Sequence, residues 1–421
     1  MKVLLDVSNL GLAHGSAETR TGIFRATEFL VDELLRRNDL DLGFAALESY
    51  VAEVQLARYD RSVAGQLGAR MVSAWDAPGT DLGASVRLVD SLESVNRDAP
   101  EGKRIVAELA LTNRLARPRA LPGAFEIVHS LKHPLRSRDR VPGALRIVTI
   151  HDMVPVLFPE LAEERFVVEH QAMTRSLEPG SDWIICNSEC TKADACRILG
   201  FPNDRAFVTP FAADPRVFRP SSDGPERTAI LARYGLAGRD YLLSLCTLEP
   251  RKNLPALLRA FFAIAGEPGN DGLLLALVGP TGWKSQPLFE LIGERPDLRE
   301  RIVLTGYVPD AELSAIYSGA RAFAYPSLYE GFGLPPLEAM CCGTAVVTST
   351  AGSIPEVVGS AAILVEPRDE AGLAAALRKV LADDRLATEM SVKGLERAKE
   401  FSWARTAQGT VAAYRAMLAS S

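Results

Sequence analysis

The sequence predicts an α/β protein with two doubly wound, Rossmann-like domains that face each other across a cleft. Short apolar segments alternate with longer segments of helical period along most of the 421 residues. Several of the short segments, such as 183–186 and 322–325, are apolar on both faces, as expected for a parallel sheet covered by helices on both sides. Residues 213–225 are rich in Asp, Pro, Ser and Gly and divide the chain into two parts of similar size. Ligands of such sheets bind outside the carboxyl ends of the strands, so we expect a site between the domains.

The first domain is expected to cover residues 1–212. A short strand at its start is followed by a loop of small and polar residues as far as Thr21, and a helix with apolar residues at helical spacing comes next. Ser188 is the expected N-cap of a later helix. Residues 50–120 are the segment in which the sequence predicts helices and strands least clearly. The expected strands are 2–7, 42–47, 70–74, 126–128, 146–150, 183–186 and 206–209, and the expected helices are 23–37, 161–177 and 191–199.

The second domain is expected to cover residues 226–400, after the linker 213–225. A final amphipathic helix lies within residues 401–421. The expected strands of this domain are 241–246, 272–278, 301–304, 322–325, 345–348 and 362–365, and the expected helices are 254–265, 311–318, 336–342 and 370–381.

Composition and charge exclude several classes of function. The net charge of −6 does not favour general nucleic-acid binding. Cys186 and Cys190 are close in sequence, but no second close pair with histidine ligands accompanies them. We therefore expect the six cysteines to be small buried side chains in a reducing compartment rather than zinc ligands. No apolar run approaches about 18 residues, and the N-terminus is expected to be a strand and not a signal peptide, so a cytoplasmic protein is expected.

The stretch 324–338 carries the strongest motif. An apolar strand is followed by a loop with Gly331 and Gly333, and two prolines then open an apolar helix. A helix N-terminus behind a glycine loop presents backbone N–H groups to an anion. Glu330 and Glu338 frame this loop. An anion cradle with acids on both sides fits a ligand that has phosphates and hydroxyls, and a sugar nucleotide is such a ligand.

A second motif, Glu249-Pro250-Arg251-Lys252-Asn253, lies between an expected strand and an expected helix. Adjacent cations at such a turn can bracket a diphosphate, Arg251 through its planar fork and Lys252 as a point charge. On its own, an ordinary solvated pair of cations is the simpler interpretation.

Together these motifs resemble the signature of retaining glycosyltransferases of family 4, the group 1 glycosyl transferases, which have the two-domain GT-B fold. The resemblance implies that Arg251 and Lys252 bind the leaving diphosphate. It implies that Glu330 holds hydroxyls of the transferred sugar and that Glu338 holds those of the ribose. It also implies that the terminal helix crosses back onto the first domain. The implied donor-binding residues of the loop are Gly331, Phe332, Gly333 and Leu334.

The same resemblance implies that residues at two further strand ends bind the nucleotide. Gly279 ends one strand, and Gly306, Tyr307 and Val308 follow another. In the family the first position borders the nucleotide and the second supplies backbone contacts to the base. For both glycines, an equally good interpretation is that the residue only ends a strand and contacts no ligand.

In the first half, His151-Asp152 ends a strand where the two sheet edges should face each other. A lone histidine is usually structural, but in the family a histidine in this His-Asp-x-x-Pro setting contacts the transferred sugar and its phosphate. The resemblance implies that Asp152 either orients that ring or contacts the acceptor. Gly22 can let a helix N-terminus approach a phosphate or acceptor closely. Arg25, on the same helix, is left outside the predicted catalytic set.

The segment 130–146 has five basic residues against one acid. A solvated loop is the simpler interpretation. The alternative is a peripheral contact with an anionic acceptor or with the inner face of a membrane, as for lipid-linked sugars.

The predicted function is transfer of a sugar from a nucleoside diphosphate sugar to a glycan or lipid-linked acceptor, with retention of anomeric configuration. GDP-mannose is the lead donor, because the stretch after His151 and the loop at Gly22 resemble mannosyltransferases of surface polysaccharide assembly. No Asp-x-Asp lies at a strand end in a plausible donor position, so no metal and no cofactor beyond the donor are expected. The alternatives are a UDP-sugar-dependent transferase of the family, a sugar-nucleotide 2-epimerase of the same fold and a catalytically silent scaffold.

Overall fold

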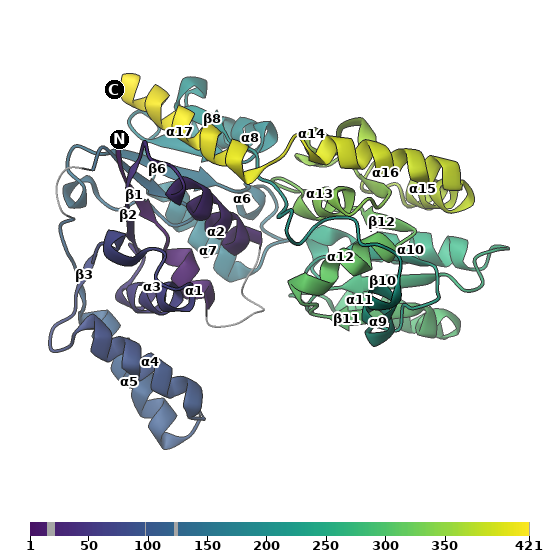
Figure 1. Cartoon of the computed structure of the whole chain (residues 1–421), viewed down its shortest axis with the longest axis horizontal. Coiled ribbons are helices and arrows are strands. Elements are labelled where there is room, and N and C mark those ends of the chain that lie inside the picture. Colours follow the sequence, from purple (N-terminus) through teal and green to yellow (C-terminus); the bar gives the residue numbers. More distant parts are fainter. Residues whose placement is uncertain (15–21, 97, 122–124, 421) are drawn as a thin grey trace.

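The structure, a computed structural model, describes residues 1–14, 22–96, 98–121 and 125–420. Two lobes lie side by side, the first coloured from purple to teal and the second mainly green (Figure 1). Each lobe contains a six-stranded sheet whose neighbouring strands are all parallel. The predicted pair of doubly wound α/β domains is therefore confirmed.

The first sheet has the order β2-β1-β5-β6-β7-β8, and the direction of winding changes between β1 and β5. Ligands of open parallel sheets bind outside the carboxyl ends of the strands at such a switch point. The loops after β1 and β5 therefore lie where a ligand is expected. The strands are β1 (Lys2–Asp6), β2 (Asp41–Ala45), β5 (Ile127–Ser130), β6 (Leu145–Ile150), β7 (Trp183–Cys186) and β8 (Ala206–Val208).

The second sheet has the order β11-β10-β9-β12-β13-β14, and its switch point lies between β9 and β12. The two motifs singled out in the sequence follow these two strands, so the fold brings them together. The strands are β9 (Tyr241–Leu245), β10 (Leu274–Val278), β11 (Ile302–Gly306), β12 (Ala322–Tyr325), β13 (Val346–Ser349) and β14 (Ala362–Val365).

Helices cover both sheets, and within the described residues each of them is too short or too polar to cross a bilayer. The helices of the first half are α1 (Ser8–His14), α2 (Gly22–Leu35), α3 (Tyr50–Ser62), α4 (Leu82–Ser94), α5 (Pro100–Leu115), α6 (Val154–Leu157), α7 (Glu164–Arg175) and α8 (Glu189–Leu199). Those of the second half are α9 (Pro225–Arg233), α10 (Leu254–Ala265), α11 (Gln286–Gly293), α12 (Asp310–Gly319), α13 (Leu334–Cys341), α14 (Ile354–Val358), α15 (Glu370–Ala382), α16 (Asp384–Ala398) and α17 (Trp403–Ala419).

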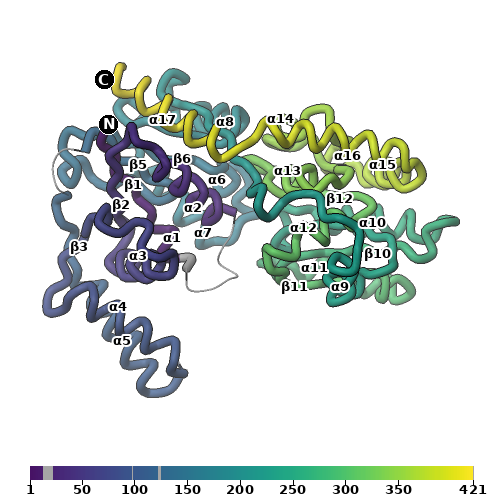
Figure 2. Tube along the Cα trace, viewed as in Figure 1, coloured from purple at the N-terminus to yellow at the C-terminus, as the bar shows by residue number. Residues whose placement is uncertain are grey.

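The terminal helix α17 returns from the second lobe and lies along the first (Figure 2). Ser402 accepts a hydrogen bond from the backbone of Arg405 and so caps its start. The Tyr414 hydroxyl lies 2.6 Å from Nδ1 of His129 in β5, and Thr406 donates a hydrogen bond to the carbonyl of Pro210.

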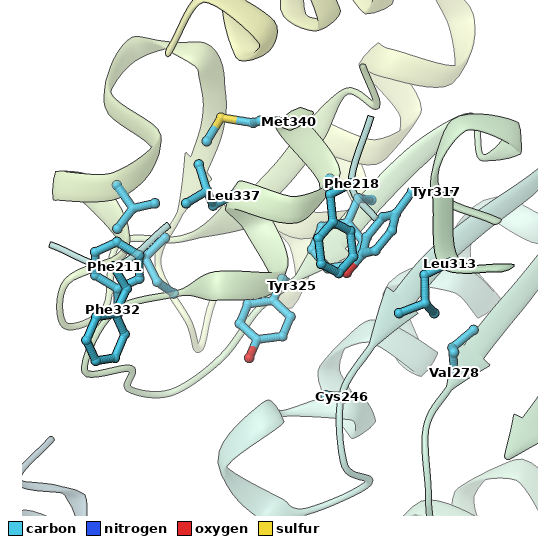
Figure 3. Close-up of a cluster of buried hydrophobic side chains, with 14 of the residues drawn as sticks. Phe211, Phe218, Cys246, Val278, Leu313, Tyr317, Tyr325, Phe332, Leu337 and Met340 are labelled. Carbon is cyan, nitrogen blue, oxygen red and sulfur yellow. The ribbon is translucent and has the colours of Figure 1, made fainter. Parts of the chain in front are cut away.

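An aromatic cluster continues the core from one lobe into the other. Phe332, from the glycine loop, and Phe211 have ring centroids 5.8 Å apart, and Figure 3 shows the two rings side by side. Phe211 also packs against Trp403 and His151. Because stacked or tilted aromatic pairs add to simple burial of area, this cluster stabilises the contact between the lobes.

Several expected elements were wrong. Residues 8–14 form helix α1 and not a loop, while the rest of that loop, 15–21, lies outside the described residues. Residues 70–74 do not form a strand: a 3-10 helix covers Gly68–Arg70, Met71 forms an isolated bridge, and a short strand, β3 (Trp75–Asp76), pairs with β4 (Arg117–Pro118). The segment 50–120 instead holds α3 and the helical hairpin α4–α5, which projects from the first lobe (Figure 1).

Candidate active site

Four charged side chains meet at the switch point of the second sheet. Arg251 and Lys252 end the 3-10 turn η5 (Pro250–Lys252) after β9, and Glu330 follows β12. Arg251 donates hydrogen bonds to Glu330 at 2.5 Å and to Glu249 at 2.6 Å, and Lys252 donates to Glu330 at 2.7 Å. Both carboxylates are buried. A partly buried arginine and a buried lysine thus face two buried anions, which satisfies the requirement that buried charges be paired.

Hydroxyl groups complete the shell around Glu330. Tyr325 and Ser327 donate to the carboxylate oxygen that also accepts from Lys252, at 2.8 and 2.7 Å. Burial alone would raise the pKa of Glu330, but Arg251 and Lys252 outweigh it and lower the pKa to about 2. Glu330 is therefore an anion at neutral pH, and its carboxylate faces the two cations.

The glycine loop lies directly against the first domain. A Cβ on Gly331 would approach the carbonyl oxygen of His151 to 2.0 Å, so only glycine allows this contact. Gly333 is the N-cap of α13 with a φ of 106°, a conformation that favours glycine. At the start of α13, Leu334 lies beside Gly22, the first residue of α2. The N-termini of α2 and α13 therefore meet between the domains, where both helix dipoles favour an anion.

Glu338 lies in α13 and is buried. Its Oε2 accepts a hydrogen bond from the Tyr317 hydroxyl at 3.0 Å. Burial raises the pKa of Glu338, and Arg25 from the first domain opposes this with its positive charge. Arg25 Nη1 lies 4.0 Å from Oε1 of Glu338, and its Nη2 donates to Asp310. Arg25 thus points toward the second domain and not along the helix surface.

The other predicted donor residues line the neighbouring strand ends. Gly279 has a φ of 131°, and a Cβ there would lie 2.0 Å from the carbonyl oxygen of Cys246, so its conformation is fixed by packing. Gly306, with a φ of 68°, has open space where a Cβ would be. Tyr307 is 42% exposed, whereas Val308 is buried. These residues lie at the same edge as Glu330.

His151 faces the second domain from the end of β6. Its Nε2 lies 2.7 Å from the carbonyl of Leu131, an acceptor, so Nε2 carries the proton and Nδ1 is the free lone pair. Nδ1 is buried and has no hydrogen-bond partner among the described residues. Burial lowers the pKa of His151 to about 4, so the ring is neutral near pH 7. Asp152 accepts a hydrogen bond from the backbone N–H of Val154, the first residue of α6.

The two domains are joined by hydrogen bonds around the glycine loop. Ser188 and Thr191 both donate to the carbonyl of Gly331, at 2.7 and 3.0 Å. Ser188 is also the N-cap of α8, as predicted, because it accepts from the backbone of Thr191. Glu356 of the second domain accepts from the first two backbone N–H groups of α8, at 2.9 and 2.6 Å. The two domains are therefore in direct contact at the glycine loop and at the start of α8.

The main residues of the site were predicted from the sequence, but several of their hydrogen-bond and ionic partners were not. Glu249 belongs to the motif 249–253 but was given no role, although its position next to two cations in the sequence could have predicted an ion pair. Tyr325 and Ser327 precede Glu330 in the stretch 324–338, and nothing in their spacing marked them as its hydrogen-bond donors. Arg25 could not be assigned, because its orientation depends on the packing of α2 against the second domain.

The basic segment 130–146 does not form a free positive surface. Arg146 is buried and forms paired hydrogen bonds with Asp182, and Arg138 donates to the same carboxylate. Arg136 bonds to Glu48, and Arg140 is also buried. These internal partners account for the charge pattern, so we do not carry the membrane contact of this segment further.

Comparison with known proteins identifies the family. Residues 227–397 match the model of the glycosyl transferases group 1 family. The O-antigen chain mannosyltransferase B of Escherichia coli is 36% identical over 270 residues, which cover 64% of this chain and 70% of that protein. A D-inositol 3-phosphate glycosyltransferase of Geodermatophilus obscurus is 31% identical over 400 residues, covering 87% and 84%.

Solved structures share the architecture. The sucrose-phosphate synthase of Thermosynechococcus elongatus superposes with a TM-score of 0.66 at 20% identity, covering 100% of this chain and 99% of that one. The glycosyltransferase WaaG, described as involved in lipopolysaccharide biosynthesis, has a TM-score of 0.59 at 14% identity, covering 97% and 98%. At these identities the likeness concerns the fold alone, which is the two-domain GT-B fold. On the sequence relationships, this chain belongs to the group 1 glycosyl transferases and is a glycosyltransferase.

Proposed function

We propose that this glycosyltransferase moves mannose from GDP-mannose to a hydroxyl of a glycan or lipid-linked acceptor, with retention at the anomeric carbon. The observation that carries this proposal is the pair Arg251–Lys252, placed at the switch point of the second sheet and beside the glycine loop. Such a cation pair is suited to a diphosphate leaving group, and a diphosphate is common to all nucleoside diphosphate sugars.

The choice of mannose rests on the relatives. The O-antigen chain mannosyltransferase B is 36% identical, and the E. coli mannosyltransferase WbdA is 28% identical over 285 residues, although this chain spans only 35% of WbdA. The alternative is a UDP-sugar donor. It is favoured by the solved complex of Anabaena HepE with UDP and glucose, which has a TM-score of 0.61.

Charge stabilisation is the main catalytic effect in this proposal. As the glycosidic bond breaks, negative charge grows on the diphosphate, and Arg251, Lys252 and the N-terminus of α13 stabilise it without rearranging. Glu330 and Glu249 hold the two cations in place before the donor arrives. We expect this arrangement to work without a metal ion. Transfer that is unchanged by EDTA would support that expectation, and loss of transfer restored by magnesium would contradict it.

The first domain contacts the sugar in this proposal. The free lone pair of His151 Nδ1 can accept a hydrogen bond from a sugar hydroxyl, and Asp152 lies next to it at the same edge. The nucleotide side is provided by Gly279, Gly306, Tyr307 and Val308, while Glu338 accepts from the ribose. Closure of the domains then excludes water from the reacting centre.

The test is a thermal-shift panel of GDP, UDP, ADP, dTDP and CDP, followed by turnover with the matching sugar donor. A ligand at 100 times its dissociation constant stabilises the folded state by about 2.7 kcal/mol, which is easily seen as a raised Tm. GDP is expected to give the largest shift. A larger shift with UDP would favour the alternative donor, and no shift with any nucleotide would favour the silent scaffold.

Product analysis separates the remaining alternative and the stereochemistry. An epimerase converts its sugar nucleotide without an acceptor, so a new sugar formed from donor alone would contradict transfer. With a mannose-terminated oligosaccharide as acceptor, NMR of the product should show the anomeric configuration of the donor, and inversion would contradict the retaining mechanism.

A further inference from the structure

Arg25 has a distinctive position in the interface. It lies in the first turns of α2 in the first domain, yet both of its ionic partners, Asp310 and Glu338, belong to the second domain. The side chain is 25% exposed, and its Nε is buried without a hydrogen-bond partner among the described residues. An arginine that reaches across a domain boundary with an unused donor is a candidate for a role in ligand binding.

The two carboxylate oxygens of Glu338 have different partners: one accepts a hydrogen bond, and the other lies only near a positive charge. Oε2 of Glu338 already accepts from Tyr317, whereas Oε1 accepts no hydrogen bond from any described residue. Arg25 Nη1 lies 4.0 Å from Oε1, which is within ion-pair range but beyond hydrogen-bond range. Arg25 therefore supplies positive charge to the carboxylate and leaves the acceptor capacity of Oε1 free.

We propose that Arg25 is a donor-positioning residue, which keeps Glu338 anionic so that it accepts hydrogen bonds from the ribose hydroxyls once the domains have closed. Asp310 holds the guanidinium at the required distance by accepting from Nη2. The proposal rests on the ribose-binding role given to Glu338 under the proposed function. It adds a residue of the first domain to the nucleotide site, and it makes recognition of the ribose depend on domain closure.

The charge balance around Glu338 supports this role. Among the described residues, the charged and titratable groups that face Glu338 are Arg25 and Asp310, with the uncharged Tyr317, Cys341 and Cys342. Arg25 is the one cation in this described set. Without it, a buried carboxylate would have only the Tyr317 hydroxyl and a neighbouring anion, which favours the protonated form.

The experiment compares the affinities of GDP and 2′,3′-dideoxy-GDP, with the UDP pair in parallel, for the full chain and its Arg25→Gln variant. Hydrogen bonds to a charged acceptor contribute about 1.5–3 kcal/mol, so the wild type should prefer the ribose form by about 10- to 140-fold. In Arg25→Gln this preference should fall to a few-fold and should recover as the pH rises, because Glu338 ionises again. Arg25→Lys should keep most of it, and Arg36→Gln, just beyond the end of the same helix, should leave it unchanged.

The outcomes separate the inference from the proposed function. If the wild type binds no nucleotide, or binds both forms equally, the ribose-binding role of Glu338 fails, and the inference fails with it. If the wild type prefers ribose and Arg25→Gln weakens both forms by the same factor, Arg25 acts elsewhere and only the inference is overturned. Arg25→Ala provides a second variant should Arg25→Gln not fold, and it should reduce the same preference.

Discussion

The two edges that meet between the domains differ in how far their polar groups are satisfied. At the edge of the second sheet, Arg251 and Lys252 are bonded to buried carboxylates, and Glu330 accepts from four donor groups. At the edge of the first sheet, buried polar atoms lack partners among the described residues. These atoms are Nε2 of His133, Nδ1 of His151, Nε2 of His170 and Oδ1 of Asn187.

The difference indicates two ways of preparing a site. Buried polar atoms without partners cost about 1–3 kcal/mol each, so a protein keeps them chiefly where a ligand or water completes them. The charged groups of the second-domain edge are already paired before the donor binds, as charge stabilisation requires. The first-domain edge is incomplete, and hydroxyls of a sugar or acceptor would complete it. Substitutions at the second-domain edge should therefore disturb the whole network of charges, whereas substitutions at the first-domain edge should each remove one contact.

The largest loss is expected from Lys252→Ala. Removing this cation leaves Glu330 with a single ionic partner and the departing diphosphate with one positioned charge fewer. We expect kcat/KM for transfer to fall at least about 100-fold, and Glu330→Ala to do the same, since each removes part of one preorganised network. Steady-state kinetics with the exposed Lys379→Ala as the control measures this, and near-wild-type turnover would remove Lys252 from the catalytic set.

Ionisation of Glu330 in the same network should make the stability of the fold depend on pH in a defined direction. The pKa of Glu330 is lowered to about 2 in the folded protein from an ordinary value of 4.5, so its ionisation stabilises the fold above about pH 4.5. That contribution should be lost as the pH falls through about 2. In Lys252→Ala the pKa of Glu330 rises toward its ordinary value, so acid unfolding should begin at a higher pH than in the wild type.

Gly331→Ala tests the contact between the two edges. Its Cβ would lie 2.0 Å from the carbonyl oxygen of His151, and a backbone atom cannot move aside as a flexible side chain can. A misplacement of about 1 Å between reacting groups can cost about 100-fold in rate, and we expect a loss of up to that size. Gly266→Ala is the control, because a Cβ there meets nothing within 4 Å. Wild-type kinetics and an unchanged radius of gyration in Gly331→Ala would show that the closed contact is not needed.

His151→Gln tests the incomplete edge. Glutamine can still donate to the carbonyl of Leu131 but lacks the free lone pair of Nδ1, whereas asparagine in His151→Asn offers an acceptor near the Nδ1 position. We expect about tenfold lower transfer for the glutamine variant, a smaller loss for asparagine, and unchanged GDP affinity for both. Equal losses in both variants would argue against the Nδ1 contact.

The pH dependence of His151 follows from its burial. Its pKa is lowered to about 4, so the unfolded chain binds a proton between pH 6.5 and 4 while the folded chain does not. Stability should therefore rise with pH across this window, by up to about 1.4 kcal/mol per unit for such a group. His151→Gln should flatten this slope, and calorimetry between pH 4 and 7 would measure it.

The sequence predicted the second edge better than the first for a physical reason. The strand 322–325, the helix 254–265 and the glycine loop are set by short-range rules of periodicity, proline and glycine, so Glu330 and Lys252 could be placed at strand ends from the sequence, while their roles came from the resemblance to the family. The first edge depends on long-range packing. The unpaired nitrogen of His151 follows from the carbonyl of Leu131, and Arg25 finds its partners only in the other domain. In the missed helix α3, the buried side chains include Glu53 and Arg58, so its buried face does not follow the pattern of apolar residues.

The smallest effect is expected from Arg138→Ser, which tests whether the basic segment matters at all. Arg138 is 43% exposed and shares Asp182 with the buried Arg146, so that carboxylate keeps its main partner when Arg138 is removed. Exposed ion pairs contribute about 0–1 kcal/mol, and we expect a loss of stability within that range, with transfer unchanged. Sedimentation with anionic vesicles should be the same for wild type and variant. Lower vesicle binding or lower turnover in Arg138→Ser would mean that this segment meets a membrane or an anionic acceptor after all, in spite of its internal partners.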